Sequence, residues 1–268
     1  KRMIALDADY LIFICTEGKN TKSFGFTKKT STGHKFAKKA YKEPLKPYKD
    51  RIKALIKEVE NEIAVNMVGE VAGIKAIFSD PNGNFRYKLK ADYKAGRPPR
   101  SALWYRLHKW CMKKYGYTKG IEADDEVAYL VSKKNWIGAS MDKDLWRGIE
   151  GDWFNVYHSK RYMTTLSPYD ARNFNLIQTI TGDRDDNIDG ISGVGETTAI
   201  KLLDKYGWNW EGVVQAYINA DRPDPADKKK RLSWGLTVDD AILARRLVCM
   251  RQWTPKKGVR LWHPPKEK

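Results

Sequence analysis

The chain has 268 residues, 41% of them hydrophobic, which suits one large domain or two small ones with a real core. Its formal net charge of +17 indicates a polyanionic partner, of which nucleic acid is the commonest. No apolar run approaches the ~20 residues of a membrane-spanning helix, and no signal peptide is visible, so we expect no membrane association. The three cysteines form no C-x-x-C pair, which predicts buried free thiols in a reducing compartment.

Apolar strand-like segments alternate with helical patterns through the first part of the chain. The predicted strands are 3–6, 71–78, 136–141 and 153–157. The predicted helices are 51–63, 101–115 and the segment that follows Gly120. This alternation favours an α/β fold, with a mostly parallel sheet flanked by helices.

Residues 18–50 form a basic segment that is poor in core residues and contains interspersed aromatic side chains. A solvated insertion and a DNA-facing loop both fit this composition, because lysines bind phosphates and aromatic rings stack on bases. The sequence leaves these two interpretations open.

The pattern becomes helical from Thr165 onward. Ser167 and Pro168 predict the start of a helix that runs to Ile180. Residues 221–231 are predicted to be a linker rich in proline and lysine, and Thr237 begins a last helix through a capping box.

Carboxylates stand just after predicted strands or at the start of helices in several separate segments. In an open parallel sheet the carboxyl ends of the strands share one edge, so we expect these acids to converge. A dense carboxylate cluster needs neutralisation by a hard cation, which favours Mg²⁺ or Mn²⁺, and the motifs lack the His and Cys ligands typical of zinc. The candidate ligands are Asp7, Asp80, Glu122, Asp124, Asp125, Asp142, Asp144, Asp183 and Asp186. The group around Glu122 also fits a simpler interpretation, in which acids gather at a helix N-terminus.

A second motif runs from Ile191 through Gly193, Val194 and Gly195 to Ala199 and Leu203. Its spacing is typical of a helix-hairpin-helix, in which glycines allow close backbone approach and a helix N-terminus binds phosphate. An ordinary packing corner between two helices is the alternative. The candidate DNA contacts of this motif are Gly193, Val194, Gly195, Thr197, Lys201 and Lys205.

Together with the early Asp7, the ordered motifs Tyr93-Lys-x-x-Arg97, Glu122-Ala-Asp-Asp125, Asp142-x-Asp144 and Gly182-Asp-x-x-Asp-Asn-Ile followed by Gly-x-Gly resemble the flap endonuclease, or 5′-nuclease, superfamily. The chain looks most like the short 5′–3′ exonucleases and flap endonucleases of tailed bacteriophages. The resemblance implies a PIN-like catalytic domain over 1–164, an arch over about 84–115 and a helix-hairpin-helix part over 165–268. It assigns no role to the basic 18–50 segment and gives Asp9 no firm counterpart.

The resemblance further implies two divalent ions roughly 4 Å apart. Asp7, Asp80, Glu122 and Asp124 would hold the first ion, and Asp142, Asp144, Asp183 and Asp186 would surround the second, with Asp125 between them. Lys94 and Arg97 would contact the scissile phosphate, and Tyr93 would stack on a base. The hairpin would hold duplex DNA and bind K⁺ through its carbonyls. We expect a monomer without an obligate protein partner, working in the cytoplasm of an infected bacterium.

Three alternatives stay open at this point. A PIN-like ribonuclease would share the acids but lack the hairpin, although cleavage of RNA in RNA–DNA hybrids is compatible with DNA cleavage. A non-catalytic DNA-binding module would be expected to have lost some of the motif acids. The nuclease part of a DNA polymerase is the third, and the chain's length and tail favour a free-standing protein instead.

Overall fold

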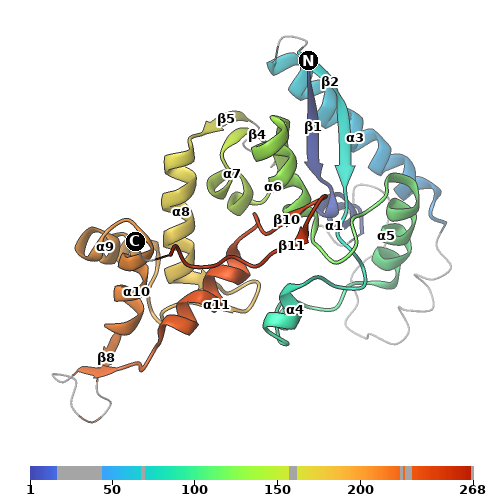
Figure 1. Cartoon of the computed structure of the whole chain (residues 1–268). Helices are drawn as coiled ribbons and strands as arrows, with labels where there is room; N and C mark the ends of the chain where they lie inside the picture. Colours follow the sequence, from blue (N-terminus) through green and yellow to red (C-terminus); the bar gives the residue numbers. More distant parts are fainter. Residues whose placement is uncertain (17–43, 68–69, 157–161, 224–225, 227–230, 267–268) are drawn as a thin grey trace. The chain divides into compact units, whose positions relative to one another are not determined.

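The computed structural model describes residues 1–16, 44–67, 70–156, 162–223, 226 and 231–266 (Figure 1). Most of the basic segment discussed above therefore lies outside the described residues. The chain divides into two compact units: Lys1–Asn84 with Pro98–Ser167, and Phe85–Arg97 with Pro168–Lys268. We call these unit 1 and unit 2 and describe each by itself. The predicted division at residue 164 into a catalytic and a DNA-binding domain stays a prediction.

A five-stranded sheet forms the centre of unit 1, in the order β2-β1-β3-β4-β5. The strands are β1 (Arg2–Asp7), β2 (Val71–Ile77), β3 (Ile137–Ser140), β4 (Gly151–Asn155) and β5 (Tyr162–Leu166). Strand β1 pairs in parallel with β2 and β3, β3 pairs in parallel with β4, and only β5 is antiparallel to its neighbour. The predicted α/β class with a mostly parallel sheet is confirmed.

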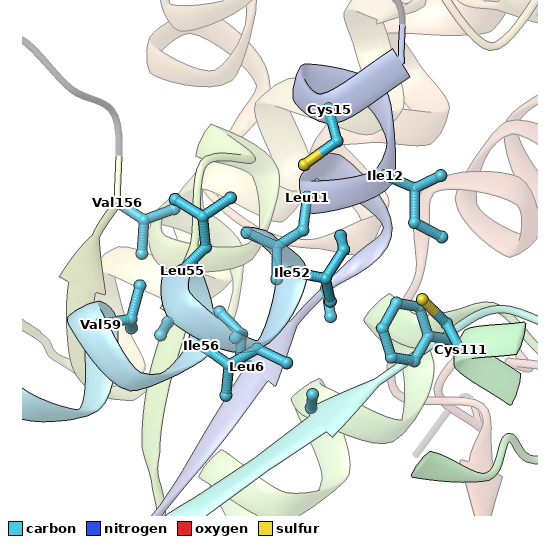
Figure 2. Packing of buried hydrophobic residues seen from close by; sticks show 14 of the residues in the cluster. Leu6, Leu11, Ile12, Cys15, Ile52, Leu55, Ile56, Val59, Cys111 and Val156 are labelled. Atoms are coloured by element: carbon cyan, nitrogen blue, oxygen red, sulfur yellow. The ribbon is translucent and has the colours of Figure 1, made fainter. Parts of the chain in front are cut away.

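Helices flank this sheet and supply most of the core of unit 1. They are α1 (Asp9–Thr16), α3 (Lys46–Asn66), α5 (Ala102–Tyr115), α6 (Ala123–Lys134) and α7 (Lys143–Gly148). The predicted apolar stripe of α3 is buried, and Figure 2 shows Ile52, Leu55 and Ile56 packed with Leu6 of β1 and Leu11 of α1.

Helix α5 begins as predicted, because the Ser101 hydroxyl accepts a hydrogen bond from the Trp104 backbone N–H at 3.1 Å. Its inner face contributes Leu107 and Cys111, both fully buried, to the same core. The three cysteines are free and buried, also as predicted. Burial raises the pKa of the Cys111 thiol to about 12, so this thiol stays neutral and unreactive near neutral pH.

The structure corrects three local expectations. Helix α3 begins at Lys46 rather than at Arg51, since Pro47 lies in its first turn and Tyr48 is buried in the core. Residues 165–166 end strand β5 instead of starting a helix, because Thr165 pairs with Asp152 of β4. The predicted linker at 221–231 contains two short antiparallel strands, which pair through Arg222 and Leu232.

Unit 2 is mainly helical. Its helices are α4 (Arg86–Leu89), α8 (Pro168–Thr181), α9 (Glu196–Tyr206), α10 (Trp210–Ile218) and α11 (Val238–Val248). Three short antiparallel strand pairs accompany them: β6 (Gly182–Asp183) with β7 (Ile188–Asp189), β8 (Asp221–Pro223) with β9 (Arg231–Ser233), and, after the last helix, β10 (Trp253–Thr254) with β11 (Gly258–Val259). Ile180, Ala199, Leu203 and Val213 are fully buried in its core.

A buried arginine connects segment 85–97 to the rest of unit 2. Arg86 is 2% exposed, and its guanidinium donates hydrogen bonds to the carbonyls of Leu247 (2.8 Å) and Cys249 (3.1 Å). These contacts hold the segment against the C-terminal end of α11.

None of the described helices is long and apolar enough to cross a membrane.

Candidate functional site

Three neighbouring parallel strands of unit 1 each deliver an aspartate at their carboxyl end. Asp7 is the last residue of β1, Asp80 follows β2 by three residues, and Asp142 follows β3 by two. Because β1 lies between β2 and β3 and pairs in parallel with both, these three segments leave the sheet along the same edge. The carboxyl edge of an open parallel sheet is the usual position for a ligand site.

Asp7 is connected to the β3 segment through Ser140. The Ser140 hydroxyl donates to Asp7 Oδ2 at 2.9 Å and accepts from the Asp142 backbone N–H at 2.9 Å. Asp142 Oδ1 in turn accepts from the Asp144 backbone N–H at 2.8 Å. Burial raises the pKa of Asp7 to about 7, and the nearby charges of Asp9 and Asp142 add to this effect. Sequence reasoning missed Ser140, since a serine inside a predicted strand gives no signal of this role.

Asp80 is held rigidly by backbone and side-chain donors. Its Oδ2 accepts from the Gly120 backbone N–H at 2.7 Å, and its Oδ1 accepts from the backbone N–H of Asn82 at 2.9 Å. The Asp80 N–H also donates to the Ile121 carbonyl at 3.2 Å. The turn after β2 is thereby bonded to the segment that precedes Glu122.

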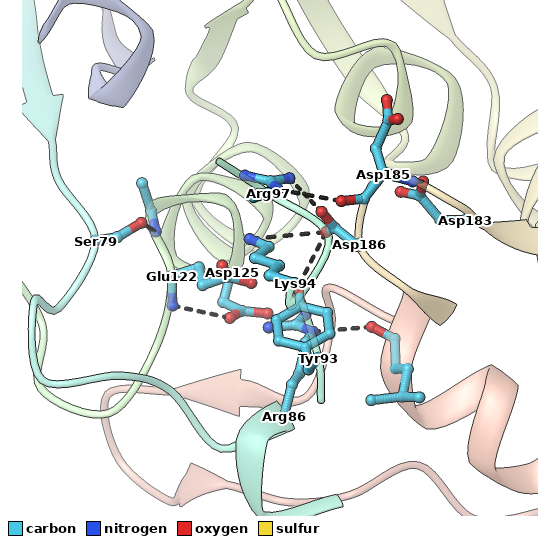
Figure 3. Close-up of polar contacts among 12 residues, drawn as sticks. Ser79, Arg86, Tyr93, Lys94, Arg97, Glu122, Asp125, Asp183, Asp185 and Asp186 are labelled. Carbon is cyan, nitrogen blue, oxygen red and sulfur yellow. Dashed lines mark hydrogen bonds and ion pairs between the residues drawn. The ribbon is translucent and has the colours of Figure 1, made fainter. Parts of the chain in front are cut away.

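The acids at the start of α6 include a helix cap. Asp125 is fully buried, and its Oδ2 accepts from the Glu122 backbone N–H at 3.2 Å (Figure 3). This contact fits the capping interpretation for Asp125. Glu122 is 8% exposed, and Asp124 is half-buried. The structure thus gives Asp125 a structural task, whereas metal ligation by Glu122 and Asp124 stays a prediction.

The donor set of unit 1 fits a hard divalent cation in its chemistry. It consists of oxygens from aspartate and glutamate, and five of the acids are buried to 9% exposure or less. Burial raises the pKa of Asp7, so a bound cation would favour its charged form. Within the part of the chain that the structure describes, no three His, Cys, Asp or Glu side chains are close enough to hold a metal ion. Like charges at one edge repel each other, so the ligand set would have to close around an incoming cation.

Unit 2 contains the predicted basic residues, and they converge on a single carboxylate (Figure 3). Lys94 Nζ lies 3.7 Å from Asp186 Oδ2, and the Arg97 guanidinium forms an ion pair with Asp186 Oδ1. The backbone is fixed too, because the Lys94 N–H donates to the Asp186 carbonyl at 2.9 Å and Arg97 Nε to the Asp185 carbonyl at 3.3 Å. Lys94 adopts a left-handed conformation with φ of 60°. A non-glycine residue keeps such a conformation only where its surroundings hold it there.

The structure gives Tyr93 a different position from the one expected for base stacking. Its ring is 3% exposed and packs with Ile188, Leu247 and Val248, and its hydroxyl donates to Asp186 Oδ2 at 3.0 Å. A ring enclosed in this way cannot stack on a base unless the packing opens. Tyr93 therefore anchors the loop that carries Lys94 and Arg97.

Asp186 is consequently occupied by donors from this loop, and it holds Lys94 and Arg97 in place. Asp183 lies in the same turn region, and burial followed by the charge of Asp186 raises its pKa. Asn187 adds a further connection, because its side-chain amide donates to the Asp92 carbonyl at 2.8 Å. Metal ligation by Asp183 and Asp186 stays a prediction.

The helix-hairpin-helix candidate has the local geometry expected from its glycines. Gly193 has φ of 78°, and Gly195 is the N-cap of α9. A Cβ built on either glycine would meet no atom within 4 Å, so the space in front of both is open. Ile191, Ala199 and Leu203 are buried beneath the hairpin. The remaining candidate contacts are exposed on α9: Thr197, Lys201 and Lys205.

Comparison with known proteins gives relatives named DNA polymerase I and 5′-3′ exonuclease. The thermostable DNA polymerase I of Thermus aquaticus is 31% identical over 189 residues, which cover 60% of this chain and 22% of the polymerase. The 5′-3′ exonuclease of Aquifex aeolicus is 30% identical over 175 residues, 58% of this chain and 60% of that protein. The 5′-3′ exonuclease of Mycoplasmopsis pulmonis is 26% identical over 201 residues, 67% of this chain and 65% of that protein. No family model matches the chain.

Solved structures agree on the fold. A flap endonuclease of bacteriophage T5, in a complex with DNA and metal ions, gives a TM-score of 0.59 at 16% identity over 94% of this chain and 90% of that one. The T5 5′-exonuclease with bound zinc gives 0.56 at 17% identity over 93% and 89%. At these identities the similarities show a shared fold, which agrees with the fold expected from the sequence. The matched sequence spans about a fifth of the polymerase and about three fifths of the Aquifex exonuclease.

Proposed function

We propose that the chain is a divalent-metal-dependent 5′ nuclease that hydrolyses DNA phosphodiesters to 5′-phosphate and 3′-hydroxyl products. One observation carries the proposal: a strongly basic protein holds buried carboxylates at the carboxyl ends of three adjacent parallel strands. A positive surface attracts the DNA backbone, while oxygen ligands at the sheet edge suit the ions used in phosphoryl hydrolysis. The similarity to named 5′-3′ exonucleases supports this assignment.

The acids would serve two neighbouring cation positions. Asp7, Asp80, Glu122 and Asp124 would hold one ion, and Asp142 and Asp144, assisted by Asp183 and Asp186, would surround the other. Bound Mg²⁺, or Mn²⁺ in its place, would lower the pKa of a water and offset the charge that develops on the phosphate. Other residues of the chain position these ligands: Ser140 orients Asp7, and the Gly120 N–H orients Asp80.

The basic residues of unit 2 would serve the substrate. Lys94 and Arg97 would contact the scissile phosphate and stabilise its developing charge. The open backbone at Gly193 and Gly195, at the N-terminus of α9, would bind a phosphate of the duplex without reading bases. Hairpin carbonyls would bind K⁺. We further propose that the protein acts as a monomer in the bacterial cytoplasm, and that segment 84–115 admits a single-stranded 5′ end.

A cleavage assay on three substrates tests this proposal. A labelled 5′-flap DNA, a blunt duplex and an RNA–DNA hybrid are incubated with the protein in Mg²⁺ or in EDTA. We expect Mg²⁺-dependent cleavage of DNA, and the length of the released fragment distinguishes flap incision from stepwise mononucleotide release. Cleavage of the hybrid would add RNA to the substrate range. Tight binding of both DNAs without cleavage in Mg²⁺ or Mn²⁺ would show instead a non-catalytic DNA-binding module.

A further inference from the structure

Asp9 is an acid near the strand ends of unit 1 to which the proposed reaction gives no task. It begins α1, two residues after Asp7. Its Oδ1 accepts a hydrogen bond from the backbone N–H of Ser79 at 3.3 Å. Ser79 immediately precedes Asp80, so Asp9 bonds the β1–α1 junction to the segment that carries the next predicted ligand.

The connection continues from Ser79 to the third ligand-bearing segment. The Ser79 hydroxyl accepts from the Ala123 backbone N–H at 2.9 Å, at the first residue of α6. Ala123 lies between Glu122 and Asp124. Through two hydrogen bonds, Asp9 therefore links the segments that carry Asp7, Asp80 and the acids of α6.

His108 of α5 faces the same oxygen of Asp9. Its ring is 3% exposed, and Nε2 lies 3.7 Å from Asp9 Oδ1, which is too long for a hydrogen bond but close enough for an electrostatic contact. Among the residues that the structure describes, this buried Nε2 has no hydrogen-bond partner. The ring is fixed by Trp104, stacked at 4.5 Å between centroids, and by the edge-on Phe78 at 6.5 Å.

A buried nitrogen without a hydrogen-bond partner lowers the stability of the fold, unless it stabilises the carboxylate that it faces. The geometry supplies a reason for this cost, because the ring edge that carries Nε2 faces the Asp9 carboxylate from α5. Phe78 and Ser79 are consecutive, so the ring contact and the hydrogen bond secure the same turn after β2.

We infer that Asp9, supported by His108, is a positioning residue of the proposed metal centre. It fixes the spacing between the ends of β1 and β2 and the start of α6, and it does not ligate the ion itself. The inference depends on the proposed function for the identity of the site. The cross-link between the segments can nevertheless be measured without metal or substrate.

Two substitutions at Asp9 separate positioning from charge. Asp9→Asn keeps an oxygen that accepts from the Ser79 N–H, whereas Asp9→Ala removes it. Mn²⁺ affinity is measured by electron paramagnetic resonance of the free ion, and hydrogen exchange of peptides covering 77–82 and 119–126 is measured in EDTA. The matched control is Asp50→Ala on the exposed face of α3 in the same unit. His108→Leu tests the supporting residue where Asp9→Ala fails to fold.

We expect Asp9→Ala to weaken Mn²⁺ binding about 10–100-fold, as is typical for residues that orient metal ligands. Exchange should accelerate in both peptides, with Asp9→Asn close to wild type and His108→Leu changed in the same direction as Asp9→Ala but less. An equal loss of affinity in Asp9→Asn and Asp9→Ala would overturn the inference, because Asp9 would then act through its charge. If the wild-type protein binds Mn²⁺ but hydrogen exchange in Asp9→Ala is unchanged, this inference is overturned and the proposed function stands. Wild type that neither binds Mn²⁺ nor cuts DNA would overturn the proposed function and the metal part of the inference.

Discussion

The carboxylate of Asp7 combines burial with a predicted role that requires negative charge. Burial raises its folded-state pKa from 3.8 to about 7, so the folded protein holds this proton more tightly than the unfolded chain. The resulting stability is fully present below pH 4 and is lost as the pH rises through 7. At pH 8 without a cation, an ionised Asp7 therefore destabilises the fold.

The upward shift of the Asp7 pKa gives a prediction about stability. In EDTA, Asp7→Asn should raise the melting temperature at pH 8.5, because the amide removes the buried charge and still accepts from Ser140. The gain should shrink towards pH 5, where wild type is protonated. Thermal unfolding across this pH range checks it, with Asp50→Asn as the exposed control. A difference that does not vary with pH would contradict the burial argument.

Asp186 gives a second prediction at the scale of single residues. Its carboxylate accepts from Tyr93 and pairs with Lys94 and Arg97, so its loss should release both basic side chains. We expect Asp186→Ala and Arg97→Ala each to lower kcat/KM, and the double variant to lose little more than the more damaging single one. A double-mutant cycle in single-turnover cleavage measures this coupling. Multiplicative losses would show that Asp186 acts independently of the arginine.

Sequence reasoning found the acids and the basic motif but missed how they are held. Aspartates at the ends of apolar runs are visible in one dimension, because strand periodicity and parallel topology determine where those runs end. Ser140 and His108 gave no signal. Their partners, Asp7 and Asp9, are about a hundred residues or more distant in the chain.

At the scale of elements, Gly190, just before the hairpin of unit 2, and Gly195, within it, are glycines for different reasons. A Cβ on Gly190 would lie 2.3–2.4 Å from backbone atoms of Ile180, Thr181 and Gly182, whereas one on Gly195 would meet no atom within 4 Å. Gly190 is therefore needed for packing. Gly195 lies at the N-terminus of α9 with open space in front of it.

Alanine substitutions should separate these two requirements. Gly190→Ala should destabilise the protein by about 1–3 kcal/mol through overpacking. Gly195→Ala should change stability by no more than about 1 kcal/mol, and weaken duplex binding roughly tenfold if it disturbs one phosphate contact. Melting curves and binding isotherms on a blunt duplex check both. Wild-type affinity in a folded Gly195→Ala protein would argue against DNA contact at this turn.

The long periodic helices and the buried parallel strands were predictable, whereas the more exposed antiparallel strands were not. The buried stripe of α3 and the capped starts of α5 and α11 carry strong local signals. Strand β5 was missed because its five residues are half exposed and pair only with β4. The pair β8–β9 was missed because proline and lysine in 221–231 favour a linker in the absence of tertiary contacts.

At the scale of the whole molecule, the net charge of +17 should dominate DNA affinity. Phosphate neutralisation releases counterions, so affinity should fall steeply with salt. With about six phosphate contacts, the dissociation constant should rise roughly a thousandfold between 50 and 200 mM salt. Fluorescence anisotropy in EDTA checks this, with Lys201→Ala expected to reduce the slope by about one. A flat salt dependence would exclude electrostatic binding as the main source of affinity.

We propose that the acids at the carboxyl edge of the unit 1 sheet form a metal-dependent catalytic centre for DNA cleavage. Its most direct test compares wild type with Asp142→Asn on a 5′-flap DNA in Mg²⁺, after binding of the same DNA in EDTA has been measured. We expect similar DNA binding, unchanged folding and cleavage reduced by at least about a thousandfold, because the variant loses a carboxylate at the reacting centre. Cleavage by Asp142→Asn at the wild-type rate would contradict it.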